Sequence, residues 1–144
     1  MRVTEARDGE KLAPGTVYIA PGTDAHMELM GGRHGHIRLR PSAPVSGHRP
    51  SVDVLFKSCA PLGKKAIGVI MTGMGKDGAQ GLHAMRKGGA LTLGQDENSC
   101  VIYGMPRAAK LLGAVAREVS LDALPKALLR ACREPLDREA LGVN

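Results

Sequence analysis

A glycine-rich turn contains the residues of this sequence that are best suited to chemistry. Gly73, Gly75 and Gly78 follow a continuous apolar run at 66–71, and Asp77 stands directly before the last glycine. Ligands of open α/β sheets bind where the strands end, so a turn at this place is a candidate site. Two interpretations are open: the turn binds a nucleotide, or Asp77 is itself the functional group.

The nucleotide interpretation depends on the spacing of the three glycines. Gly73 to Gly78 spell the G-x-G-x-x-G pattern of dinucleotide-binding proteins, and Asp96 follows the next expected strand as that pattern requires. Asp77 argues against it, because a carboxylate among the turn amides would repel a pyrophosphate. The pattern also normally opens its fold, whereas here it lies in the middle of the chain.

The second interpretation uses the charge of Asp77. A carboxylate at a helix N-terminus is favoured in its charged form by the helix dipole and by nearby N–H groups. Such an anion can orient a histidine and stabilise it as an imidazolium. The amides near Met74 and Gly75 could donate to an oxyanion. Spacing alone favours a simpler hypothesis, in which Asp77 only caps the helix that follows.

Strand and helix patterns alternate around this turn and predict an α/β fold with a doubly wound, mostly parallel sheet and an added antiparallel hairpin. The run at 66–71 is typical of a strand buried on both faces, and residues 1–15 are expected to be irregular. Ser51 is expected to cap the first helix. We expect strands at 16–20, 66–71, 90–93, 99–103 and 114–119, a hairpin from 27–30 and 36–39, and helices at 51–60, 79–87, 106–113 and from Asp122 onward.

Composition excludes several classes of protein. The chain has 144 residues, which suits one domain, and a net charge of +6. The charge is dispersed and there are only two Tyr, one Phe and no Trp, which argues against nucleic-acid binding; an acidic protein partner stays open. No apolar run is long enough to span a membrane, and no signal peptide opens the chain. Three widely spaced cysteines, Cys59, Cys100 and Cys132, without a CxxC pair, fit a reducing cytoplasm.

Several runs together resemble the catalytic domain of CheB-type chemotaxis methylesterases, in that family's order and spacing from about residue 3 to 130. The resemblance implies hydrolysis of glutamate methyl esters on chemoreceptors, often with deamidation of receptor glutamines, by a Ser-His-Asp triad and without metal or organic cofactor. Asp77 matches the family's triad aspartate, and Met74 matches the residue whose backbone amide is assigned to the oxyanion hole. The runs are Tyr18–Gly22, Arg49–Phe56, Gly68–Gly78, Gln95–Cys100 and Tyr103–Arg107.

The resemblance also implies what this sequence lacks. In the family, the nucleophilic serine and the histidine both precede the region that resembles this chain, as does a receiver domain. We therefore expect residues 1–134 to be a partial catalytic domain, 135–144 to be a C-terminal tail, and the chain alone to have no methylesterase activity. A sheet without its first strands would expose an unpaired edge, so a partner segment, a dimer or aggregation is expected.

Other serines and histidines do not replace the missing pair. No serine stands in a strand-to-helix elbow; Ser51 is expected to be a cap and Ser99 an ordinary loop residue. His26 and His48 are expected to line the region near the site. His34 and His36 could share a strand face and bind a metal, but no third ligand stands close to them. Three hypotheses remain: a part of a receptor methylesterase, which we favour, a non-catalytic receptor-binding remnant, and a nucleotide-binding protein.

Overall fold

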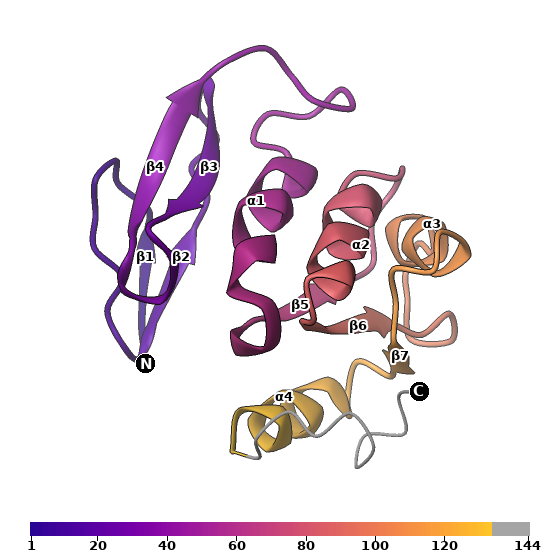
Figure 1. Cartoon of the computed structure of the whole chain (residues 1–144). Coiled ribbons are helices and arrows are strands. Elements are labelled where there is room, and N and C mark those ends of the chain that lie inside the picture. The colour runs from indigo at the N-terminus through magenta and orange to yellow at the C-terminus, as the bar shows by residue number, and fades with distance from the viewer. Residues whose placement is uncertain (134–144) are drawn as a thin grey trace.

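The computed structural model describes residues 1–133, and the predicted tail at 135–144 lies outside them. Two short 3-10 helices, η1 (Gly32–His34) and η2 (Ala60–Lys65), join the main elements. In chain order those elements are β1 (Arg2–Glu5), β2 (Thr16–Ile19), β3 (Ala25–Met30), β4 (His36–Pro41), α1 (Val52–Cys59), β5 (Ile67–Ile70), α2 (Ala79–Lys87), β6 (Leu91–Gln95), α3 (Met105–Leu111), β7 (Arg117–Val119) and α4 (Leu124–Arg133) (Figure 1).

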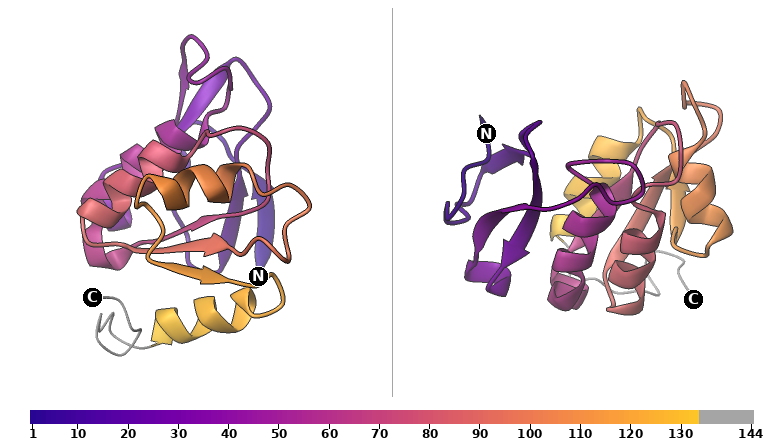
Figure 2. Two further views of the ribbon diagram at one scale, coloured as in Figure 1. Left: turned by 90° about the vertical axis from the view of Figure 1, so that its right-hand side faces the viewer. Right: turned by 90° about the horizontal axis from the view of Figure 1, so that it is seen from above.

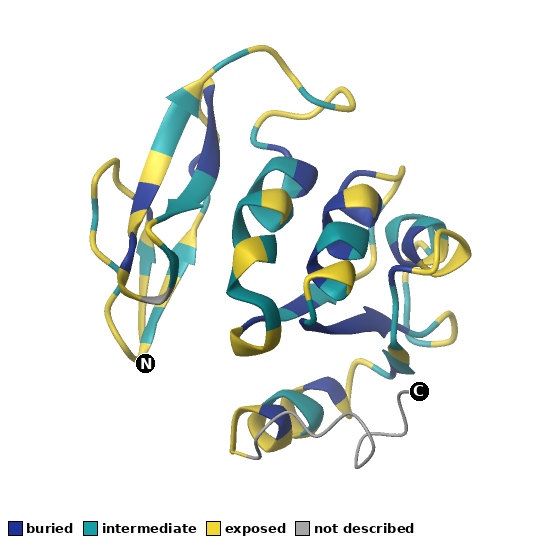
Figure 3. Cartoon of the chain, in the orientation of Figure 1, coloured by how far each residue is buried: buried dark blue, intermediate teal, exposed yellow. Residues whose placement is uncertain are grey.

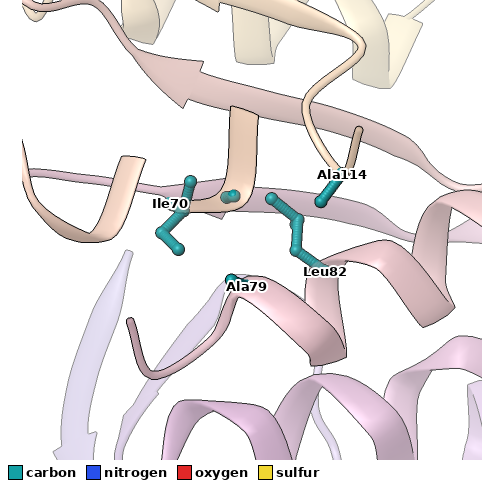
Figure 4. Packing of buried hydrophobic residues seen from close by; sticks show 5 residues of the cluster. Ile70, Ala79, Leu82 and Ala114 are labelled. Carbon is teal, nitrogen blue, oxygen red and sulfur yellow. The ribbon is translucent and has the colours of Figure 1, made fainter. Parts of the chain in front are cut away.

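A three-stranded parallel sheet in the order β5-β6-β7 carries the centre of the fold. Helices α1, α2 and α3 lie over one face and α4 lies over the other, as Figures 1 and 2 show from three directions. Each face has its own apolar cluster. Ile70 and Leu82 pack with α2 and α3 residues on one face (Figure 4), and Leu93 packs with α4 on the other. The expected doubly wound arrangement is therefore confirmed.

The central strand is β6, in which every residue is buried. The sequence predicted full burial for the preceding strand instead, and this was wrong. Ile67 and Val69 of β5 are only partly buried, because β5 pairs with β6 alone among the described residues and forms an edge of the sheet. An apolar run identified the strand correctly but could not tell a central strand from an edge.

The N-terminal region forms two further strand pairs beside α1. β3 and β4 pair antiparallel, as the hairpin pattern predicted, while β1 and β2 pair in parallel. The prediction that residues 1–15 are irregular was wrong for Arg2–Glu5, which form β1 although the short segment carries no alternation. Val3 and Ile19 remain 60% and 54% exposed on this pair. Figure 3 draws the two strands partly in the yellow of exposed residues and partly in the teal of intermediate ones.

A further wrong prediction concerns residues 99–103, where β-branched and aromatic residues suggested a strand. This segment consists of turns, with one isolated bridge between Tyr103 and Gly73. Its shape is set by polar side chains, because the Asp96 carboxylate accepts hydrogen bonds from the Ser99 amide (3.0 Å) and hydroxyl (2.5 Å). A local Asp–Ser turn thus outweighs the strand propensity of the residues that follow it.

Helices α1 and α2 lie side by side with their N-termini at the same end of the molecule (Figure 1). Gly81 allows this close approach, since a Cβ at that position would stand 2.7 Å from the Cβ of Phe56 and 2.8 Å from the carbonyl oxygen of Asp53. The contact brings the N-terminus of α1 beside the turn that precedes α2. It is this pairing that positions the candidate site.

Candidate active site

Asp77 lies in the turn between β5 and α2 and is only 4% exposed. Its carboxylate accepts three hydrogen bonds: from the hydroxyl of Ser51 (2.7 Å), the amide of Val52 (2.8 Å) and the amide of Asp53 (3.1 Å). These donors belong to the N-terminus of α1, whose dipole also favours a negative charge there. Three donors that converge on one carboxylate hold it firmly in place.

The capping role of Asp77 therefore differs from the hypothesis that it caps the helix that follows it. Asp77 caps α1, the neighbouring helix, and not α2, the helix that it precedes; the N-cap position of α2 is Gly78, which makes no side-chain cap. The N-terminus of α2 is served in return by α1, because the amide of Gly81 donates to the carboxylate of Asp53 (2.7 Å). Two buried carboxylates thus cap each other's helices.

Ser51 stands at the N-cap position of α1 with an extended backbone, but its side chain makes no hydrogen bond to that helix. The prediction that its side chain caps α1 was wrong, because the hydroxyl donates to Asp77 instead. Ser51 is 2% exposed and its hydroxyl does not bond a histidine. It holds the carboxylate in place and has neither the access nor the partner of a nucleophile.

His26 is fully buried and contacts Ser51, the hydroxyl donor to Asp77. Its Nδ1 accepts the amide of Ser51 (3.0 Å), which leaves Nε2 as the donor to the carbonyl oxygen of Ala43 (2.9 Å). Both ring nitrogens are therefore engaged with the backbone, and neither contacts Asp77. The prediction that His26 lines the region near the site is confirmed, and its role is to support Ser51.

The glycine turn itself places Met74 at the surface. Gly75 and Gly78 have φ angles of 94° and 90°, which glycine adopts without strain. The Met74 side chain is 74% exposed. Within residues 1–133 its N–H makes no hydrogen bond, whereas the amides of Thr72 and Gly73 on the same turn are both bonded. A free amide beside a buried carboxylate can donate to a developing oxyanion.

The same geometry weakens the nucleotide interpretation of this turn. Asp77 lies beside the start of α2, and the Gly81 amide in its first turn already bonds Asp53. Two carboxylates near one helix N-terminus oppose the binding of a pyrophosphate there. The G-x-G-x-x-G spacing is therefore present, but the two carboxylates make the turn negatively charged, and a pyrophosphate is negatively charged as well.

The remaining predicted residues are not brought together. His48 is exposed in a turn, and His34 lies in η1 while His36 lies in β4, so the two do not share a strand face. In the described part of the chain no group of three His, Cys, Asp or Glu could hold a metal ion. Cys59 is partly buried, and burial raises the pKa of its thiol.

Sequence reasoning missed Gln95 and Tyr103, which support the loop beside the turn. Gln95 is 1% exposed and accepts the amide of Thr72 (2.9 Å). A glutamine ending a buried strand was the only signal available.

Tyr103 donates to Glu118 (2.5 Å), which also pairs with Lys110 (2.5 Å). Burial, followed by the bond to Glu118, raises the pKa of Tyr103 to about 12, and Lys110 lowers the pKa of Glu118.

Comparison with known proteins shows the family to which the chain belongs. A family model described as CheB methylesterase matches residues 1–128. A protein-glutamate methylesterase/protein-glutamine glutaminase 1 of Caulobacter vibrioides is 59% identical over 129 residues, which cover 89% of this chain and 38% of that protein. A protein of the same name from Dechloromonas aromatica is 56% identical over 132 residues, covering 90% of this chain and 37% of its own length.

A solved structure is similar over most of the fold. The crystal structure of the Thermotoga maritima CheB methylesterase catalytic domain matches with a TM-score of 0.83 and 35% identity, over 88% of this chain and 67% of that domain. The chain thus spans less than two fifths of the Caulobacter relative and about two thirds of a catalytic domain. Across the described residues, no helix is both long and apolar enough to cross a membrane.

Proposed function

Because the chain belongs to the CheB methylesterase family, we propose that it supplies the carboxylate and the oxyanion-binding amide of a Ser-His-Asp protein-glutamate methylesterase. Asp77 is the proposed triad carboxylate and Met74 contributes the backbone N–H. The observation that carries this proposal is the turn itself, in which a carboxylate held by three donors stands close in sequence to an amide without a partner.

The proposed reaction needs two residues that this chain does not bring to the site. A serine hydroxyl attacks the ester carbonyl of a glutamate methyl ester while a histidine takes its proton, and Asp77 orients that histidine. The oxyanion that forms accepts the Met74 N–H, and its collapse releases methanol with the proton from the histidine. Water then hydrolyses the acyl-serine to free glutamate. We therefore propose that residues 1–144 alone are inactive.

The substrate side of the proposal follows the names of the relatives. Those names combine protein-glutamate methylesterase with protein-glutamine glutaminase, which supports ester hydrolysis and deamidation on protein side chains. Chemotaxis receptors in the cytoplasm are the proposed partners. The free thiols of Cys59, Cys100 and Cys132 fit that reducing compartment. We propose residues 1–134 as one partial catalytic domain.

A methanol-release assay on methylated receptor tests the proposal. Residues 1–144 are compared with a chimera in which they follow the preceding part of the Caulobacter vibrioides relative. The expected result is no release above background by the chain alone and release by the chimera at a rate within about tenfold of the intact relative. A chimera that folds but releases no methanol would contradict the proposed function. Stable receptor binding by that inactive chimera would instead favour a non-catalytic binding module.

A further inference from the structure

The turn that carries Met74 is attached to the loop at 96–104 by its first two residues. The hydroxyl of Thr72 donates to the carbonyl oxygen of Ile102 (3.1 Å) and accepts the amide of Ile102 (2.9 Å). The amide of Gly73 donates to the same carbonyl oxygen (3.1 Å), and the Gly73 carbonyl accepts the amide of Met105 (2.8 Å). The position of the turn therefore depends on the position of this loop.

Gln95 joins the turn and the loop with a single side chain. Its Oε1 accepts the amide of Thr72 (2.9 Å), and its Nε2 donates to the carbonyl oxygen (2.7 Å) and the hydroxyl (3.3 Å) of Ser99. Gln95 is the last residue of β6, the fully buried central strand. Its side chain thus joins the fully buried central strand to both the turn and the loop.

Gly104 closes the arrangement from the other side. A Cβ at Gly104 would lie 2.5 Å from the carbonyl oxygen of Gly73 and 3.2 Å from the amide nitrogen of Gly75. The loop backbone therefore presses directly against the turn on both sides of Met74. With the Thr72 amide bound by Gln95 and Gly73 in contact with the loop, the Met74 N–H has little freedom to change direction.

We propose that Gln95 is a positioning residue that fixes the Thr72 amide and thereby aims the Met74 N–H at the oxyanion. This inference rests on the proposed function, in which the Met74 amide donates to the oxyanion. Gln95 contacts no substrate and acts through Thr72. Loss of the contact lets the turn shift, and oxyanion donors are effective only at hydrogen-bond distance from the developing charge. The expected consequence is a lower kcat with little change in KM.

A matched pair of substitutions separates positioning from simple support. Gln95→Met keeps the size of the side chain and removes its hydrogen bonds to Thr72 and to Ser99. Ser99→Ala removes the hydroxyl contacts to Asp96, to the Leu121 amide (3.0 Å) and to Gln95 Nε2 (3.3 Å), so it loosens the same loop, yet it leaves the Gln95–Thr72 bond in place. If Gln95 only stabilises the loop, the two variants behave alike.

NMR on residues 1–144 tests the contact without any need for catalysis. A through-hydrogen-bond coupling between the Thr72 nitrogen and the Gln95 side-chain carbonyl carbon is expected in the unsubstituted chain. In Gln95→Met the Thr72 amide is expected to exchange about tenfold faster or more, with a shifted Met74 amide signal, whereas Ser99→Ala leaves both nearly unchanged. Absence of the coupling would overturn the proposal even if a variant failed to fold.

Kinetics in the chimera described above test the consequence for catalysis. Gln95→Met is expected to lower kcat about 10- to 100-fold with KM within about twofold, and Ser99→Ala to keep kcat within about threefold. Equal losses in the two variants would overturn the positioning role. An unsubstituted chimera without activity would count against the proposed function instead, and the NMR comparison would still decide whether Gln95 directs the Met74 amide.

Discussion

Asp77 and Asp53 are two buried carboxylates that perform the same structural task in opposite directions. Each caps the neighbouring helix, Asp77 for α1 and Asp53 for α2, and they are 4% and 3% exposed. They differ in their donors: Asp77 accepts three hydrogen bonds, including the Ser51 hydroxyl, while Asp53 accepts one from the Gly81 amide. They also differ in place, since only Asp77 stands in the turn that carries the free Met74 amide.

The difference shows that burial and capping alone do not identify a functional carboxylate. Asp53 is as deeply buried as Asp77 and is hydrogen-bonded, yet its surroundings are explained by helix capping alone. Asp77 has the same structural explanation and, in addition, lies where the parallel strands end and where an oxyanion could be bound. Substitutions at the two positions should therefore affect activity very differently.

The largest expected difference is in catalysis by the chimera. Asp77→Asn should lower kcat about 10⁴-fold, because an amide cannot hold the histidine in the required tautomer. Asp53→Asn is the matched control and should retain kcat within about threefold, since its amide oxygen can still accept the Gly81 N–H. Both rates are measured by methanol release. Similar losses at both positions would mean that the carboxylates act only through the packing of α1 on α2.

Gly81→Ala should disturb both caps at once. Its new Cβ would stand 2.8 Å from the Asp53 carbonyl oxygen and 3.0 Å from the Asp53 Cα, so the backbones of α1 and α2 must separate. The free energy of unfolding should fall by about 3 kcal/mol. Urea unfolding followed by far-UV circular dichroism measures this, since the chain has no Trp. Gly81 lies inside α2 and has no positive φ, so the loss of stability reports the steric clash and not backbone strain.

Ser51→Ala tests the side-chain hydroxyl donor, which Asp77 has and Asp53 lacks. Removing the hydroxyl takes away one charge-assisted hydrogen bond (2.7 Å) and leaves the two backbone donors, so stability should fall by about 2 kcal/mol. The same urea titration provides the number. Val52→Ala, one residue further on, keeps all three donors and serves as the control. An unchanged stability in Ser51→Ala would show that the backbone amides alone hold Asp77.

Glu118, a partly exposed carboxylate, should contribute less to the free energy of unfolding than the buried groups above. Glu118 has a side chain 29% exposed, and its pKa is lowered first by the hydrogen bond from Lys110 and then by that from Tyr103. A lowered pKa in the folded state contributes stability above the ordinary value of 4.5, and this is lost as the pH falls through the lowered pKa. Glu118→Gln should cost less than about 1 kcal/mol at neutral pH.

The same urea titration, repeated near pH 3, checks this sign. There the difference between Glu118→Gln and the unsubstituted chain should shrink toward zero. The pKa of Tyr103 is raised to about 12, so its contribution to stability has the opposite pH dependence. That contribution is complete below about pH 10 and is lost as the pH rises toward 12. A difference at position 118 that grows on acidification would contradict the assignment of Glu118 as an ionised acceptor.

Local patterns predicted the elements around the site well, because α1, α2, β2 and the β3–β4 hairpin follow from apolar spacing and turn residues. The family resemblance singled out Asp77 and Met74 as candidate site residues, and their catalytic roles stay a prediction. The partners of Asp77 could not be predicted, since Ser51 is distant in the chain and its hydroxyl turned away from its own helix. Gln95 was missed for the same reason: its hydrogen bond to Thr72 depends on the strand order.

The reciprocal caps also constrain the order in which the chain folds. Helices of 8 and 9 residues, such as α1 and α2, are marginal by themselves in water. The N-terminal amides of each find their carboxylate only when the other helix has docked, which requires closing the long connection through β5. Neither helix should therefore persist alone in the unfolded ensemble, and the two should consolidate in one cooperative step that also assembles the candidate site.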